Sequence, residues 1–492
     1  MAIITPSTNN LNSVAAPQKQ TLSSNYLDLA STANQGWAQQ YVPDLMEKEA
    51  EVFGNRTISG FLSQVGAEEP MTADQVVWSE QGRLHISLKG TVDLDGGDSS
   101  QGLFTVTGDI DGNEDGENGF AVANHGVRVN DTVLLSSNNV VVKAIVHTVS
   151  SAAISVKSYE TAVLTGLSEV AKATTLLVYG SEFKKGDTYN GSDARTANEP
   201  TFKSFNNKPI ILKDYYEVSG SDASRIGWVE ITSEEGQSGY LWYLKAESDT
   251  RSRFTDYLEM SMLESQIAES ASVADTFLAG AASPTGTQGL FDAIEDRGNI
   301  TSGVTGVNAA TDLAEFDAIL AEFDKQGAIE ENMIFVNRSS SLAIDDMLAS
   351  MNSYGSGGTS FGVFSNDEEM ALNLGFSGFR RGSYDFYKSD FRYLNDKATR
   401  GGINDTAGSS AIRGVFIPAG TSTVYDQQLG KNLTRPFLHV RYRASQTDDR
   451  KMKTWVTGSV GAATSSLDAM QIHFLSERCL ITQGANNFML MK

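Results

Sequence analysis

The chain has 492 residues, 61 acidic and 38 basic, and its formal net charge is −23 at pH 7. This length fits about two to four domains, and a hydrophobic content of 40% is enough for substantial cores. An acidic surface of this size repels nucleic acid over most of its area, because affinity for phosphate needs clustered Lys and Arg. Cys479 is the single cysteine, which excludes a disulfide framework and a thiolate metal site within one chain and indicates a reducing compartment.

The N-terminal residues carry no recognisable targeting segment. Residues 1–26 lack a basic region followed by an apolar one, and no stretch approaches the roughly 20 apolar residues that span a bilayer. We therefore expect a soluble protein, made inside a cell and not directed to a membrane. The first 25 or so residues are rich in Ser, Thr, Asn and Gln, which predicts a mobile arm; a helical segment around 37–52, divided by Pro43, follows it.

Between about residues 75 and 245 the hydrophobic pattern has a period of two. Short runs rich in Val, Ile and Thr alternate with turn residues, which is typical of a small barrel or sandwich. Glycine-rich and acidic segments bracket roughly residues 95–180, and we interpret this part as a β module inserted into a longer β excursion. The strand-like runs are VVWSEQGRLHISLKG, FTVTG, GVRVNDTVLLS, VVVKAIVHTV and AAISVKSY.

After residue 245 the pattern changes to that of helices. Apolar residues at helical spacing predict one long amphipathic helix over 251–279. A second helix is predicted over 312–327, with Asp312 as its N-cap and Glu315 completing a capping box. With the strands that follow, these elements predict an α+β protein. The later elements are the strand MIFVN, the helix LAIDDMLASM and the strands FYKSDFRYLN, AIRGVFIPAG, FLHVRYRAS, DAMQIHFLS and CLITQ.

The run DIDGNEDGENGF at 109–120 is similar to the first half of a calcium-binding loop. Counted from Asp111, positions 1, 3, 5 and 6 fit, but position 12 is Val122 and not the bidentate Glu of a helix–loop–helix site. A solvated acidic hairpin loop is the favoured interpretation, because tight turns use the same residue types. A weak calcium site of another kind stays open as the alternative, and its ligands would be Asp109, Asp111, Asn113 and Asp115.

No constellation in the sequence predicts catalysis. There is no nucleophile elbow, P-loop, dinucleotide-binding fingerprint or H-E-x-x-H motif. His85 and His147 lie in predicted strands and are interpreted as packed or surface residues, and Cys479 as a buried structural thiol. We therefore predict that the protein is not an enzyme and has no catalytic, cofactor-binding or metal-binding residues. No two of the histidines have a metal-ligand spacing: His85, His125, His147, His439 and His473.

Two groups of basic residues stand out from the acidic background. We interpret them as partners of acids in the same chain or in a neighbouring copy, in preference to a phosphate site, because no array of aromatic and basic residues accompanies them. An arm, a long β excursion and an acidic surface with basic spots together favour a self-associating protein. The first group is Arg380, Arg381, Lys388 and Arg392; the second is Arg435, Arg441, Arg443, Arg450, Lys451 and Lys453.

Five segments carry a resemblance to a known family through their order. They are PDLMEKEAEVFGNRTISGFLSQVGAEEPMTADQVVWSE at 43–80, FNNKPIILKDYYEVSGSDA at 205–223, the helix at 251–279, GTQGLFDAIEDRGN at 286–299 and IFVNRSSSLAIDDML at 334–348. In this order they resemble the entry into an extended loop, the returning strand of that loop, a spine helix, and elements of peripheral and axial domains. This is the arrangement of the major capsid proteins of tailed double-stranded DNA bacteriophages, with the Hong Kong ninety-seven type fold. The chain also looks similar to capsid proteins of crAss-like podoviruses.

The resemblance implies an α+β tailed-phage major capsid fold with an N-terminal arm, an extended β-hairpin loop, a long spine helix, and peripheral and axial domains. The inserted β-rich module departs from the family's minimal fold, so its role is not carried over. The implied parts are the N-terminal arm (1–40), the start of the peripheral domain with the first strand of the extended loop (41–95), the inserted module (96–180), the returning part of the extended loop (181–250), the spine helix and peripheral domain (251–330), and the axial domain with the return to the peripheral domain (331–492).

The implied function is mechanical. Copies would self-assemble as hexamers and pentamers into the icosahedral capsid that encloses the DNA genome. Implied partners are the chain itself, portal and head decoration or auxiliary proteins, and packaged double-stranded DNA through weak non-specific contact, with no membrane and no cofactor. The protein would be assembled in the host bacterial cytoplasm and reside in the virion. The alternative is a β-rich, calcium-dependent surface-binding or adhesin-like protein, which explains the acidic run but not the long central helix.

Overall fold

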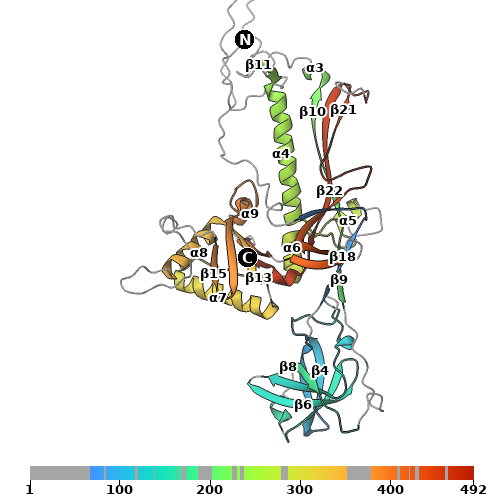
Figure 1. Cartoon of the computed structure of the whole chain (residues 1–492), viewed down its shortest axis with the longest axis vertical. Coiled ribbons are helices and arrows are strands. Elements are labelled where there is room, and N and C mark those ends of the chain that lie inside the picture. The colour runs from blue at the N-terminus through green and yellow to red at the C-terminus, as the bar shows by residue number, and fades with distance from the viewer. Residues whose placement is uncertain are drawn as a thin grey trace, which may run out of the picture.

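The computed structural model has three parts: an elongated body, a lateral lobe and a barrel (Figure 1). The body contains a long helix with long strands beside it, the lobe extends to one side, and the barrel lies beyond the end of the body (Figure 1). The predicted arm at 1–40 and the helical segment at 37–52 lie outside the described residues. The structure describes residues 67–81, 85–116, 120–137, 139–161, 163–167, 173–186, 202–223, 230–232, 238–278, 286–327, 329–351, 378–406, 411–419, 421–426, 431–459 and 464–492.

The body is a five-stranded sheet backed by one long helix, α4 (Leu241–Glu264). Its strands are β1 (Ala67–Met71), β10 (Ile210–Ser219), β20 (Leu438–Arg443), β21 (Lys453–Gly458) and β22 (Ala469–Thr482). β10 pairs with one side of β22, β20 and β21 divide the other side, and β1 adds in parallel to β20. Phe254 and Leu258 of α4 pack against Ile472 and Phe474 of β22, so the helix covers one face of the sheet.

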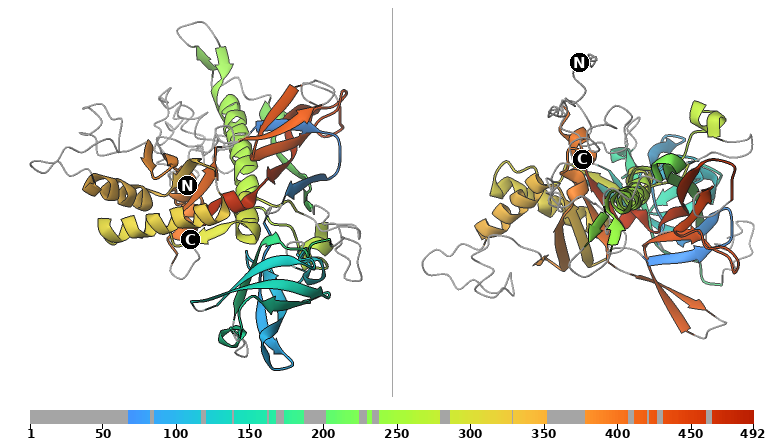
Figure 2. Two further views of the ribbon diagram at one scale, coloured as in Figure 1. Left: turned by 60° about the horizontal axis from the view of Figure 1, so that its bottom comes forward. Right: turned by 90° about the horizontal axis from the view of Figure 1, so that it is seen from above.

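The predicted helix over 251–279 is wrong at both ends. α4 begins at Leu241 and ends at Glu264, and a separate short helix, α5 (Val273–Leu278), follows it (Figure 2). At the end of α4, Glu264 accepts hydrogen bonds from Tyr393 and Arg400, both at 2.8 Å. Beyond it the apolar periodicity continues, but Val273 and Phe277 are 88% and 85% exposed, so one continuous helix would gain little from burying them.

The lateral lobe is a six-stranded mixed sheet with α7 (Ala309–Gln326) and α8 (Arg338–Met351) on one face. Phe316 and Phe323 of α7 meet Phe386 and Phe416 of the sheet in one buried cluster. α6 (Leu290–Arg297) packs in the cluster shared by lobe and body. Across the sheet the strands are β13 (Asn299–Thr301), β23 (Met489–Met491), β17 (Gly414–Pro418), β14 (Glu331–Val336), β16 (Tyr384–Asp390) and β15 (Gly378–Arg381).

The predicted cap of the second helix is wrong, because α7 begins before Asp312. Asn308 is the N-cap, and its side chain accepts a hydrogen bond from the Thr311 amide at 3.0 Å. Asp312 is buried in the first turn and accepts from the Gly306 amide at 2.8 Å, so it holds the preceding loop instead. Gly327 ends the helix in a left-handed conformation, as the pattern predicts.

The inserted module is a closed barrel whose strands pair in the order β3, β4, β7, β6, β5, β8. They are β3 (Ser87–Asp95), β4 (Asp98–Asp109), β5 (Asp131–Ser137), β6 (Val140–Val149), β7 (Ala153–Ser158) and β8 (Thr174–Ser181). The predicted limit at 96 is wrong, because the barrel begins at Ser87. Gly96 and Gly97 both have positive φ and form the turn of the β3–β4 hairpin, which a boundary at 96 would divide.

The predicted α+β class with an inserted β module is confirmed. Among the described residues, no helix combines the length and the apolar composition needed to cross a bilayer. The smaller elements are the strands β2 (Val76–Gln81), β9 (Phe202–Asn207), β11 (Glu230–Thr232), β12 (Ser238–Tyr240), β18 (Thr421–Asp426) and β19 (Lys431–Pro436), the helices α3 (Gly220–Ala223) and α9 (Arg400–Asn404), and the 3₁₀ turns η2 (Val122–Asn124), η3 (Leu164–Gly166), η5 (Arg392–Leu394) and η6 (Ala485–Asn487).

Removal of the barrel at its structural limits is expected to leave a folded body and lobe. Gln81 and Phe202 are cross-strand partners in the β2–β9 ribbon, so an Asn-Gly turn in place of residues 82–201 should close a simple hairpin. Circular dichroism should show a cooperative melt. The matched deletion of 96–180 leaves β3 without its hairpin partner and should aggregate. An insoluble 82–201 deletion would mean that the body needs the barrel to fold.

Candidate functional site

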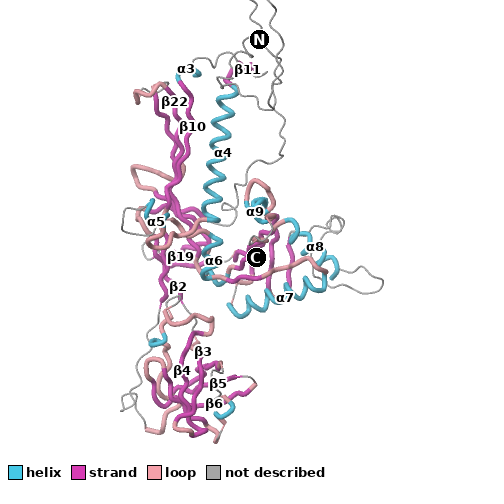
Figure 3. Tube along the Cα trace, turned by 180° about the vertical axis from the view of Figure 1, so that it is seen from behind, coloured by secondary structure: helices cyan, strands magenta, loops and turns pink. Residues whose placement is uncertain are grey.

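The barrel is joined to the body by the two-stranded ribbon of β2 and β9 (Figure 3). At the foot of the ribbon, Trp78 packs with Met71, Cys479 and Ile481 in a small buried cluster. The contacts at this foot therefore fix the ribbon to the body. We call this region the ribbon root and define it by Trp78, Glu80, Phe205, Asn207 and Arg297.

Asn207 is the hydrogen-bonding centre of the ribbon root, and it is 1% exposed. Its amide nitrogen donates to Leu480 O at 2.6 Å and to Gln288 O at 3.0 Å. Its Oδ1 accepts from the Thr287 hydroxyl at 3.0 Å and the Gln288 amide at 2.9 Å. One side chain thus joins β9, β22 and the turn before α6 through these four hydrogen bonds; a fifth is local, from the Lys208 amide at 2.9 Å.

Arg297 completes the ribbon root from α6. Its guanidinium lies 4.4 Å from the centroid of the Phe205 ring and 5.7 Å from that of Trp78, and it pairs with Glu80 at 3.7 Å. Burial lowers the pKa of Arg297, and the Glu80 charge opposes that shift. Glu80 also accepts from the Trp78 indole at 2.8 Å and from the Gly484 amide at 2.9 Å, so the root is polar, aromatic and internally bonded.

The second basic group is bound to acids of the same chain. Glu477 accepts from Arg443 at 2.8 Å and pairs with Arg450 at 3.0 Å. These pairs tie β1, β20 and the loop before β21 to β22, and they confirm the ion-pair interpretation for the residues that the structure describes. The side chain of Arg435 lies outside the described part. The other pairs are Arg441 with Glu69, Arg443 with Asp74, Lys451 with Glu68 and Lys453 with Asp448.

The first basic group is also paired within its own lobe. Lys388 and Asp345 are both nearly buried, with 2.5 Å between Nζ and Oδ1. The other pairs are Arg380 with Asp385, Arg381 with Asp317 and Arg392 with Asp396. The described side chains of both basic groups thus form intramolecular pairs, which again confirms the interpretation as ion pairs.

The face of the body sheet opposite α4 carries a row of aromatic rings that was not predicted. Because neighbouring strand residues alternate faces, His473 points away from the helix that Phe474 contacts. Its ring stacks on Trp455 with 5.1 Å between centroids and on Tyr215 with 6.0 Å. Tyr215 is 56% exposed. In the sequence, the only signal for this row is the period-two pattern of each strand. The row itself depends on the register that aligns the three strands, which the sequence does not show.

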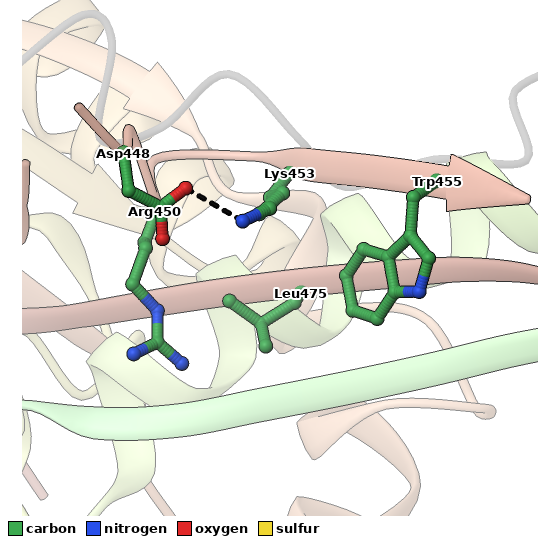
Figure 4. A pocket seen from close by; sticks show the side chains of 5 residues that line it. All are labelled: Asp448, Arg450, Lys453, Trp455 and Leu475. Atoms are coloured by element: carbon green, nitrogen blue, oxygen red, sulfur yellow. Dashed lines mark hydrogen bonds and ion pairs between the residues drawn. The ribbon is translucent and has the colours of Figure 1, made fainter.

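An open hollow of about 370 Å³ lies beside this row, where β21 begins (Figure 4). The Trp455 ring forms one wall and Leu475 lies between that ring and the charged side chains (Figure 4). Lys453 and Asp448 form an ion pair at 2.6 Å across one side of the rim. The hollow is lined by Asp448, Arg450, Lys453, Trp455 and Leu475, and we call it the β21 hollow.

The acidic run at 109–120 forms a turn in the described residues. Asp109 accepts from both the backbone and the side-chain amide of Asn113, at 2.9 and 2.7 Å. Asp115 accepts from the Val122 amide at 2.8 Å. These hydrogen bonds are those of the predicted acidic turn. No cluster of three or more His, Cys, Asp or Glu arranged for a metal occurs in the part of the chain that the structure describes.

The histidines are dispersed through the described structure. His125 and His439 are buried, and burial lowers the pKa of His125. His473 bonds to the Thr457 hydroxyl through Nε2 at 2.7 Å within the aromatic row. Cys479 is fully buried, and burial raises the pKa of its thiol to about 12, so it is a structural residue.

Comparison with known proteins gives likenesses only among solved structures. No family model and no curated protein matches the chain. It is similar to a structure named Microbacterium phage Oxtober96, with 8% identity, a TM-score of 0.37 and coverage of 95% of this chain and 99% of that one. The capsid structure of the Cyanophage P-SCSP1u has 7% identity and a TM-score of 0.38, with coverage of 95% of this chain and 98% of that one. The capsid of an empty GTA particle has 10% identity and a TM-score of 0.35, with coverage of 94% of this chain and 98% of that one. At TM-scores below 0.5 these likenesses establish neither a family nor a function for this chain.

Asn207→Ala is expected to lower the stability of the body by about 2–4 kcal/mol, because it leaves buried polar groups on two other segments without a partner. Urea unfolding followed by circular dichroism measures the effect. Asn206→Ala is the matched control: Asn206 is the exposed neighbour in the same strand and should change stability by less than about 0.5 kcal/mol. Equal effects of the two substitutions would contradict the role of Asn207.

Cys479 should be unreactive at pH 8 in the folded chain, since the raised pKa keeps it a thiol. An aromatic disulfide reagent should release one equivalent only after unfolding. Because the folded pKa is above the unfolded one, this group's stabilising contribution is complete below the ordinary value of 9.0 and is lost as the pH rises toward about 12. Cys479→Ala should remove this part of the pH dependence of the unfolding free energy. Rapid labelling of Cys479 in the folded chain would contradict its burial.

Proposed function

We propose that this chain is a structural subunit that self-assembles, as hexamers and pentamers, into the icosahedral capsid of a tailed double-stranded DNA phage. The observation that supports the proposal best is the projecting β segment. A ribbon that is anchored at its root by Asn207 and Arg297 leads to a barrel beyond the body. A projection beyond the body suits contact with a neighbouring copy better than it suits a ligand site. The order of ribbon, long helix, body and lobe also agrees with the order in which the sequence resembles capsid proteins.

The surfaces of the body support the same proposal. The described cations of both basic groups pair with acids of the same chain, whereas the large side chains at Tyr215 and Ile211 are 56% and 53% exposed. Interfaces between proteins are enriched in aromatic residues and depleted of acidic residues and lysine at their centres. Closed shells need contacts between different patches that repeat from copy to copy, and this chain presents separate apolar patches on separate elements.

The finer assignments are part of this proposal. The ribbon, with the segments around it, is the extended loop; α4 is the spine helix; and the body is the peripheral domain. The lateral lobe is the axial domain, which then takes in β13 and α7 from the predicted peripheral span of 251–330. The relation to crAss-like podoviruses, the portal and decoration proteins as partners, the weak contact with packaged DNA and assembly in the host cytoplasm follow from the resemblance in sequence order. The barrel would project outward and add contacts between capsomers or bind a decoration protein.

Sedimentation of the purified chain over a range of concentration and salt, with electron microscopy of any fast fraction, tests the proposal. We expect rings, tubes or closed shells of one repeating subunit, unchanged by EDTA. Moderate salt should promote assembly, since each copy has a formal charge of −23 and screening reduces the repulsion between copies. A melting temperature that falls on addition of EDTA, in a chain that stays monomeric, would favour the calcium-dependent adhesin-like alternative.

A further inference from the structure

α5 presents an apolar face that no described part of the chain covers. Val273 is 88% exposed and Phe277 is 85% exposed. They are four residues apart in one helix, so their side chains lie on the same side. The helix stands apart from the rest of the body when the molecule is viewed from above (Figure 2). An aromatic and a branched side chain held together in water mark a contact surface.

The surroundings of α5 are acidic over a long stretch of chain. No Lys or Arg occurs between Arg253 and Arg297, and Glu269 and Asp275 lie next to the apolar pair. We call the apolar pair of Val273 and Phe277 the knob. A knob with acidic residues around it fits a hollow that combines an apolar wall with a basic rim, since opposite potentials select and orient partners.

The β21 hollow has these properties. Trp455 and Leu475 supply its apolar wall, and Arg450, Lys453 and Asp448 complete its lining. Arg450 pairs with Glu477, but its side chain is 28% exposed against 7% for that of Glu477, so the cation is the more exposed partner at the rim. The Trp455 ring is already held by stacking on His473, so little side-chain freedom is lost when a second ring packs beside it. Its volume of about 370 Å³ is within the range of about 300–1,000 Å³ found for ordinary ligand sites, enough for two apolar side chains.

We propose that α5 of one copy docks into the β21 hollow of a second copy, with Phe277 against Trp455 and Leu475, and Val273 at the rim. The inference rests on the proposed function in so far as it needs the chain to self-associate. The knob and the hollow are different patches, so the contact is heterologous. Each copy gives one knob and receives another, which is the arrangement that builds rings and shells.

Photo-cross-linking of the full chain tests the contact. The photoreactive phenylalanine analogue p-benzoylphenylalanine replaces Phe277 in an unlabelled chain, which is assembled with an isotopically heavy wild-type chain. Mass spectrometry should find light–heavy adducts between the α5 peptide and the peptides that contain Trp455 or Leu475. The same analogue at Val307, which is 71% exposed on another segment, should not label these peptides. Adducts within one chain only, or equal labelling from both positions, would overturn the proposal.

A second measurement separates contact from folding. Phe277→Ser and Trp455→Ala should each raise the concentration needed for assembly by tenfold or more, roughly the effect of losing an aromatic residue at the centre of an interface. Each variant should melt as the wild type does, and Val307→Ser should assemble normally. The double variant should need no higher concentration for assembly than the more severe single variant, because the two substitutions remove the same contact. Additive effects would show that the two side chains act in different places.

The two proposals fail in different ways. Shells that form without adducts from position 277 overturn the docking of α5 and leave the capsid function standing. A chain that stays monomeric at every concentration and gives no light–heavy adduct overturns both.

Discussion

The arrangement of this molecule depends on one buried side chain, Asn207, and four of its hydrogen bonds join three segments far apart in the sequence. The ribbon that leads to the barrel is anchored to the body at this point. The cost of a long insertion is small when its ends are already close, because the entropy of loop closure grows only with the logarithm of length. Gln81 and Phe202 are cross-strand partners, so the body tolerates the barrel between them without a change in its own packing.

The second constraint is the use of charge inside the chain. Glu477 is 5% exposed and holds two arginines, and Arg478, also buried, donates to the Lys451 carbonyl at 2.9 Å. A buried pair contributes little net stability, but loss of one partner leaves an uncompensated charge, so such pairs specify one arrangement of strands. β22 can therefore continue as one strand through its polar middle. The sequence pattern predicted two strands there, DAMQIHFLS and CLITQ, because the polar residues between them looked like a connection. Several of the paired cations still reach the surface, such as Lys453, whose side chain is 42% exposed.

Local patterns predicted the parts of this fold that depend on local order. Period-two runs gave the barrel strands, and Gly327 marked the end of α7. The barrel limit failed because the Gly96–Gly97 turn looks like a boundary and is the tip of a hairpin. The ribbon root could not be predicted, since an Asn before Lys208 reads as a turn residue, and its partners are 80 and 273 positions away. The aromatic row likewise depends on the register of three strands.

A strongly acidic chain that must bind copies of itself cannot rely on general attraction. At physiological salt the Debye length is about 8 Å, so repulsion between copies acts mainly where surfaces approach closely. Contacts must then combine apolar side chains with local regions of the opposite sign. α5, in a stretch without cations, and the β21 hollow, with Arg450 and Lys453 on its lining, are such a pair. A single contact of this size is weak, and a closed array in which every copy gives and receives one becomes stable through their number.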